Sequence, residues 1–144
     1  MSYIAGKYVY AITIKPLKGV LKKDGTYSKG AVSKDASNRP RFLNRFFERL
    51  NALCKCSATL VKEFHSDGWA HYHGVIGCSL PIDWVAFSKS CSMKIDTRKP
   101  FCKVHATPVF NLEEWLKYCT KDLEENMIIS NYKFDQFVTQ HVCC

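Results

Sequence analysis

Apolar and polar positions alternate along several short stretches of the chain, which is typical of strands with one buried face. β-Branched and aromatic residues dominate 7–15 ("KYVYAITIK") and predict a first strand, closed by a proline. The same pattern predicts strands at 57–64 and 71–78. The loop between them contains Gly68, which can adopt the left-handed conformation that a short hairpin loop needs. A fourth strand is expected within 101–110 ("FCKVHATPVF").

Helical spacing of apolar residues marks three other segments. Residues 39–55 ("RPRFLNRFFERLNALCK") predict an amphipathic helix with arginines along a neighbouring stripe. A short helix is expected within 81–91, begun at its proline, and a final helix within 111–125. Asn111 and Glu114 form a capping-box pattern at the start of that last helix. This order of elements, with short connections, favours an antiparallel sheet covered by helices, an α+β fold.

The chain length and its apolar runs narrow the class of protein. Its 144 residues suffice for one domain with its own core. We see no apolar run long enough to span a membrane and no secretion signal at the N-terminus, so we expect a soluble, non-secreted protein with no membrane partner. The eight cysteines are then expected to stay reduced.

The net charge of +8 is concentrated in one part of the sequence. Residues 15–45 contain nine Lys or Arg and only two Asp. Such a concentration suits a nucleic-acid backbone, because neutralising phosphates releases counterions. The candidate DNA-binding residues in and beside this segment are Lys15, Lys22, Lys23, Arg41, Arg45 and Arg49. A solvated loop is the alternative interpretation of the charge.

Glu63, His71 and His73 form the clearest candidate site in the sequence. Side chains two apart on a strand share a face, so His71 and His73 project together. If residues 66–68 form the hairpin loop, Glu63 lies opposite His71, with Cβ atoms roughly 5 Å apart. Two imidazoles and a carboxylate with room for further ligands favour a divalent ion. Polar residues satisfied on a sheet face are the alternative.

Tyr118, Lys121 and Asp122 share one face of the expected final helix, because they stand at i, i+3 and i+4. A phenol with a pKa of about 10 is a weak nucleophile at neutral pH unless a cation is close. Lys121 and a bound metal would both supply that cation. Tyr-x-x-Lys alone is common in helices, but beside the metal candidates it predicts Tyr118 and Lys121 as catalytic residues.

Three stretches of the chain resemble, in order, the motifs of a known family. They are "AITIKP" (11–16), "EFHSDGWAHYHGVI" (63–76) and "YCTKD" (118–122). Together they resemble rolling-circle replication initiators of the His-hydrophobic-His (HUH) endonuclease superfamily. The nearest resemblance is to the N-terminal nuclease domain of the replication-associated proteins (Rep) of eukaryotic circular single-stranded DNA (CRESS) viruses, and it covers most of the chain from residue 8 to 122.

The resemblance implies a five-stranded antiparallel sheet with flanking helices, of the ferredoxin-like or RRM-like type, and a bound Mg²⁺ or Mn²⁺. It assigns the ion to Glu63, His71 and His73, with Asp122 as a further candidate ligand. It makes Tyr118 the nucleophile, while Lys121 would neutralise phosphate charge or protonate a leaving oxygen. Such domains cut one strand of a stem-loop origin, stay attached to the 5′ phosphate through tyrosine and free a 3′ hydroxyl.

The resemblance also implies partners and a place in the cell. We expect single-stranded DNA at a stem-loop origin as substrate, the host replication machinery as a partner, and the host nucleus, or otherwise the cytoplasm, as the location. Residues 1–122 would form the nuclease domain. Since no helicase domain with a phosphate loop follows, we expect a fragment of a longer chain, with 123–144 as a tail or linker and self-association through the missing C-terminal region. The segment 17–40 is longer and more basic than the family pattern.

Two alternatives remain open at this point. A single-strand transposase of the same superfamily also combines paired histidines with a helix tyrosine. A non-catalytic module that binds single-stranded nucleic acid would use Tyr8, Tyr10 and Trp69 as stacking platforms on a sheet. The second alternative would explain the basic segment but not the alignment of a glutamate with two histidines.

Overall fold

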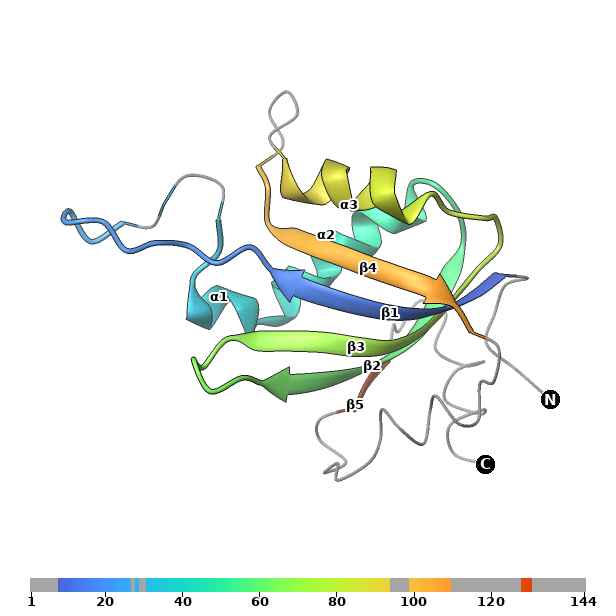
Figure 1. Ribbon diagram of the computed structural model, residues 1–144, viewed down its shortest axis with the longest axis horizontal. Helices are drawn as coiled ribbons and strands as arrows, with labels where there is room; N and C mark the ends of the chain where they lie inside the picture. Colours follow the sequence, from blue (N-terminus) through green and yellow to red (C-terminus); the bar gives the residue numbers. More distant parts are fainter. Residues whose placement is uncertain (1–7, 27, 29–30, 94–98, 110–127, 131–144) are drawn as a thin grey trace.

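A computed structural model describes residues 8–26, 28, 31–93, 99–109 and 128–130 (Figure 1). One antiparallel sheet organises them, in the order β4-β1-β3-β2-β5. The strands are β1 (Tyr8–Pro16), β2 (Cys56–Phe64), β3 (Ala70–Cys78), β4 (Cys102–Pro108) and β5 (Ile128–Ser130). Each of the first four agrees with an expected strand to within two residues at either end.

The α+β class is confirmed, while the sheet differs from the resemblance in one respect. Four strands of seven to nine residues form its body, and the fifth, β5, has only three residues beside β2. β5 lies within 123–144, the segment expected as a tail or linker. Residues 128–130 of that segment therefore belong to the sheet.

Three helices accompany the sheet: α1 (Lys34–Ser37), α2 (Pro40–Asn51) and α3 (Trp84–Ser92). The expected start of α3 at Pro81 is wrong, because the Asp83 carboxylate accepts the Ala86 amide at 3.1 Å and caps the helix two residues later. The four-residue α1 was not expected. Ser33 caps its start, because the Ser33 hydroxyl accepts from the Ala36 amide at 3.1 Å. The expected final helix lies outside the described residues.

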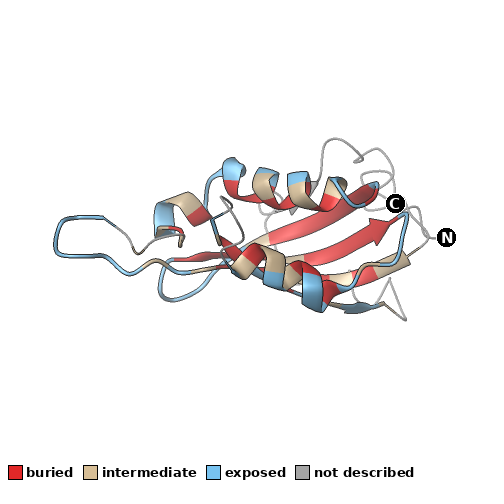
Figure 2. Cartoon of the chain, turned by 90° about the horizontal axis from the view of Figure 1, so that it is seen from above, coloured by how far each residue is buried: buried red, intermediate tan, exposed pale blue. Residues whose placement is uncertain are grey.

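The core fills the space between α2, α3 and the even-numbered face of the sheet (Figure 2). Phe42 of α2 stacks on Tyr72 of β3, with ring centroids 5.6 Å apart, and Phe46 contacts Phe87 of α3 edge-on at 5.7 Å. Tyr10 of β1 contacts Trp84 of α3 at 5.2 Å. The odd-numbered strand residues, among them His71 and His73, therefore face away from both helices.

A basic excursion leads from β1 to α1 and extends away from the sheet (Figure 1). Its tip is a tight turn in which Gly25 has a φ of 86° and the Lys22 amide donates to the Thr26 carbonyl at 2.6 Å. The excursion returns through a parallel bridge between Lys18 and Val32.

Two sequence-based expectations can be checked on the described residues. The five cysteines among them, Cys54, Cys56, Cys78, Cys91 and Cys102, are all free and buried. No helix in the described ranges is long and apolar enough to cross a membrane.

Candidate functional site

The β2–β3 hairpin positions the candidate metal ligands. Its register pairs Glu63 with His71, as the loop length predicted, and this expectation is confirmed. The loop turns at Gly68, whose φ is 85° and whose amide donates to the His65 carbonyl at 2.8 Å. The Asp67 carboxylate accepts from the Trp69 amide at 3.0 Å. Local turn chemistry therefore fixes which residues face each other across the hairpin.

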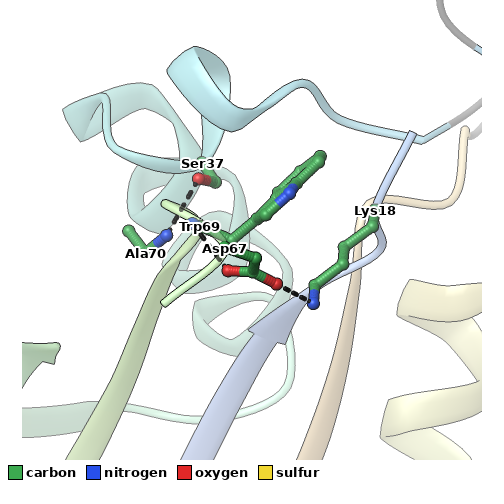
Figure 3. Close-up of polar contacts among 5 residues, drawn as sticks. All are labelled: Lys18, Ser37, Asp67, Trp69 and Ala70. Atoms are coloured by element: carbon green, nitrogen blue, oxygen red, sulfur yellow. Dashed lines mark hydrogen bonds and ion pairs between the residues drawn. The ribbon is translucent and has the colours of Figure 1, made fainter. Parts of the chain in front are cut away.

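Two other segments contact the loop end of this hairpin (Figure 3). The Ser37 hydroxyl, at the end of α1, accepts from the Ala70 amide at 3.2 Å, one residue before His71. Lys18 of the excursion forms an ion pair with Asp67 in the loop. The hydrogen bond from Lys18 is the main reason that the pKa of Asp67 lies below its usual value. The excursion and α1 thus restrain the strand end that carries the first histidine.

Glu63 and His73 lean towards each other across the hairpin. Oε2 of Glu63 lies 3.6 Å from Nδ1 of His73. The carboxylate is half-exposed, while most of the imidazole is covered, so the pair lies at the edge of solvent. An open carboxylate beside an imidazole can accept a ligand without rebuilding the sheet.

His71 is buried, with only 7% of its surface exposed. Within the described residues neither of its ring nitrogens has a hydrogen-bond partner, and its ring stacks on that of His65 at 3.6 Å. Burial lowers the pKa of His71, and the neighbouring charges of His65 and Lys18 lower it further. These effects favour the neutral form of the ring, which is the form that binds a metal.

The ligand atoms of Glu63, His71 and His73 are of types that bind divalent ions, although the described side chains do not form a complete metal site. No three His, Cys, Asp or Glu side chains among the described residues are arranged to hold a metal ion. Glu63 nevertheless offers an oxygen ligand of the kind Mg²⁺ and Mn²⁺ prefer, and the two histidines offer imidazole nitrogens. The buried, unpartnered nitrogens of His71 are what a ligand, ion or water would satisfy.

Two further histidines were not considered in the sequence analysis: His65, which stacks on His71, and His105, which lies two strands away from His73. His65 follows Glu63 by two positions, so the alternation of the strand could have revealed it. His105 lies on β4 and pairs with Thr13, which also pairs with His73, so the three form one row across the sheet. His105 could not have been found from local sequence, because the row depends on pairing between distant strands.

The candidate DNA-binding residues fall into separate places. Lys15 is on the same sheet face as His73 and pairs with Lys103, a further basic residue. Lys22 and Lys23 are exposed at the tip of the excursion. The three arginines, Arg41, Arg45 and Arg49, are on α2, on the opposite side of the sheet. The structure therefore does not bring all six residues to one surface.

The tyrosines can be compared as nucleophiles only in part, because Tyr118, Lys121 and Asp122 lie outside the described residues. Tyr72 is buried on the helix-covered face, and its hydroxyl donates to the Ser37 carbonyl at 2.6 Å. Burial raises the pKa of Tyr72 to about 12. Tyr72 is therefore unsuited to attack a phosphate, in agreement with its expected direction on the strand.

The stacking platforms of the non-catalytic alternative are mostly covered. Tyr10 and Trp69 are both buried, with 8% and 6% of their surfaces exposed. Buried rings cannot stack on bases without a rearrangement.

No protein-family model and no curated protein matches this chain. The functional proposal therefore rests on the geometry and chemistry of the site.

Proposed function

We propose that the chain is a metal-dependent endonuclease and strand transferase that nicks single-stranded DNA at a stem-loop origin and so initiates rolling-circle replication. The observation that carries the proposal is the hairpin register that pairs Glu63 with His71, with His73 next on the same face. The lowered pKa of His71 supports it, because it favours the neutral imidazole, the form that binds a metal.

The proposed site would combine an ion with groups of the chain. Glu63, His71 and His73 would hold Mg²⁺ or Mn²⁺, which when bound polarises the scissile phosphate. Tyr118 would attack the phosphorus: a bond forms from its oxygen, the bond to the 3′ oxygen breaks, and the 5′ phosphate stays on the tyrosine. The phenol loses its proton to solvent as it attacks, and the 3′ oxygen takes up a proton, for which Lys121 is the candidate donor. Attack by the freed 3′ hydroxyl would reverse the step and rejoin the strand.

The finer features of the family belong to this proposal. They are the HUH variant of the fold with its fifth full strand, Asp122 as a further metal ligand, the host replication machinery as a partner, self-association outside this chain and a nuclear location. The transposase alternative uses the same chemistry, and only the DNA substrate distinguishes it.

One observation favours the non-catalytic binding module as a second candidate. Lys15 and Lys103 pair on the sheet face that carries the histidines, and they would attract a phosphate backbone even without catalysis. A binding module would yield neither a cut strand nor a covalent adduct.

The test is incubation of the chain with a randomised library of stem-loop oligonucleotides and Mn²⁺. We expect a nicked product and a protein–DNA adduct, with the nucleotide located on Tyr118 by mass spectrometry. Tyr118→Phe removes only the phenolic oxygen and should reduce nicking by at least about 1,000-fold, because the nucleophile is lost. Tyr8→Phe, a matched change on β1, should nick like the parent chain.

Two results would reject the assignment. An adduct on another residue, or nicking by Tyr118→Phe at the parent rate, would show that the nucleophile is misidentified. DNA binding with no cut strand under any condition would favour the binding module.

A further inference from the structure

A basic groove of about 580 Å³ runs along α2 on the helix-covered side of the sheet. Its cationic lining residues are Arg39, Arg41, Arg45, Arg49 and Lys99. Among the described residues that line it, none is acidic, and Phe42 belongs to its apolar floor. We name this surface the arginine groove.

A ring and two carbonyl groups hold two of the arginines, and no carboxylate of the described residues forms an ion pair with either one. The guanidinium groups of Arg45 and Arg49 lie over the ring of the buried Phe101, at 4.2 and 4.7 Å from its centroid. Both donate to the Lys99 carbonyl, at 3.4 and 3.2 Å, and Arg49 also donates to the Ser90 carbonyl at 2.7 Å. Carbonyl groups and a ring orient the two cations but do not cancel their charge.

The other cations of the arginine groove add to its positive charge. Arg41 and Lys99 are exposed at the groove, whereas Arg39 forms an ion pair with Asp35. Burial lowers the pKa of Arg45, and the positive charges of Arg49 and Arg41 lower it further. An anion in the groove would relieve this repulsion between like charges.

The spacing of the arginines suits a repeating anion better than a single one. Arg41, Arg45 and Arg49 recur at four-residue steps, about 6 Å apart along the helix axis. Guanidinium groups present paired donors that match phosphate oxygens. A nucleic-acid backbone offers phosphates in such a row.

The groove and the proposed metal site lie on opposite faces of the sheet. Phe42, in the groove floor, packs on the even-numbered face through Tyr72, while His71 and His73 are on the odd-numbered face. We propose that the arginine groove binds the phosphate backbone of a DNA segment other than the one at the metal site. The domain would then hold its substrate on two faces. The identity of the ligand as DNA rests on the proposed function.

The test uses two oligonucleotides and a matched pair of variants. A strand of about 8 nucleotides is near the length that a single small binding surface covers, whereas a stem-loop of about 30 nucleotides can also reach the second face. Arg41→Glu with Lys99→Glu alters two exposed groove residues. Lys55→Glu with Lys89→Glu changes the net charge equally at two exposed positions that do not line the groove.

We expect the groove variant to bind the long DNA about 10-fold or more weakly, with a smaller salt dependence, because phosphate contacts are lost. Its affinity for the short strand should match that of the control variant. Equal affinity of both variants for the long DNA would overturn the proposal, as would an equal loss on short and long DNA.

The readout also separates this proposal from the proposed function, because binding does not require cleavage. Binding is measured by fluorescence polarisation in the presence of a chelator, and nicking of stem-loop DNA is measured separately with Mn²⁺. A missing nicked product with a length-dependent loss of binding would reject the nuclease and keep the groove. Normal nicking without a length-dependent loss of binding would keep the nuclease and reject the groove.

Discussion

His71 combines burial with two ring nitrogens that have no hydrogen-bond partner within the described residues. A buried polar group left in this state costs about 1–3 kcal/mol, so it does not stabilise the fold. Its neighbours nonetheless hold it in place, since Ser37 binds the adjacent Ala70 amide and His65 stacks on the ring. The free-energy cost of burying His71 is understandable if the imidazole binds a ligand, as the proposed metal site requires.

Replacing His71 and His73 by alanine should weaken metal binding strongly and abolish nicking. The reason is that Glu63 alone would remain of the three proposed ligands. We expect affinity for Mn²⁺, measured by titration calorimetry, to fall at least about 100-fold. DNA binding should stay near the parent level, because the basic residues are untouched.

His105→Ala is the matched control, because His105 is in the same row of the sheet as His73 but two strands away. This control should bind Mn²⁺ like the parent chain. Nicking by the double alanine variant that persists in a chelator would contradict the metal site.

At the scale of elements, the β2–β3 hairpin could be predicted because its information is local. The left-handed Gly68 and the two-residue alternation set the register without reference to the rest of the chain. The start of α3 was missed because Pro81 is a favourable first residue of a helix, while the Asp83 side chain makes the actual cap. α1 was missed because four residues are too few to show a helical period.

Gly74 of β3 lies directly against the backbone of β2. A Cβ at this position would lie 2.1 Å from the Thr59 carbonyl oxygen and 3.0 Å from the Leu60 Cα, both on β2. Gly74→Ala must therefore push the two strands apart beside His73. We expect the free energy of unfolding, measured by urea denaturation, to fall by about 1–3 kcal/mol.

Thr107→Ala, at an exposed position of β4, is a suitable control for Gly74→Ala and should change stability by no more than about 0.5 kcal/mol. If the Gly74 variant were as stable as the control, the close approach of β2 to this glycine would be wrong.

At the scale of the whole molecule, two basic regions that are close in sequence lie in different places in the structure. Lys22 and Lys23 are at the tip of the excursion, whereas Arg41 and Arg45 are on α2 against the even-numbered face. The sequence predicted the concentration of charge but not this division. Arg45 and Arg49 are oriented by the ring of Phe101, which is more than fifty positions away in the sequence. Local sequence could therefore not predict their direction.

The tip of the excursion gives the last prediction. Its turn is fixed by Gly25 and by the Asp24 carboxylate, which accepts from the Thr26 amide at 2.9 Å, so Lys22 and Lys23 project from an ordered loop. If both lysines contact phosphates, replacing them by alanine should lower the slope of log affinity against log salt by about 1.4 for single-stranded DNA. Fluorescence polarisation over a series of salt concentrations measures this slope. Lys55→Ala with Lys89→Ala, two exposed lysines elsewhere, should leave the slope unchanged. Because all four side chains are exposed, no variant should lose stability, and an unaltered slope for the Lys22 and Lys23 variant would mean that these charges only solvate the loop.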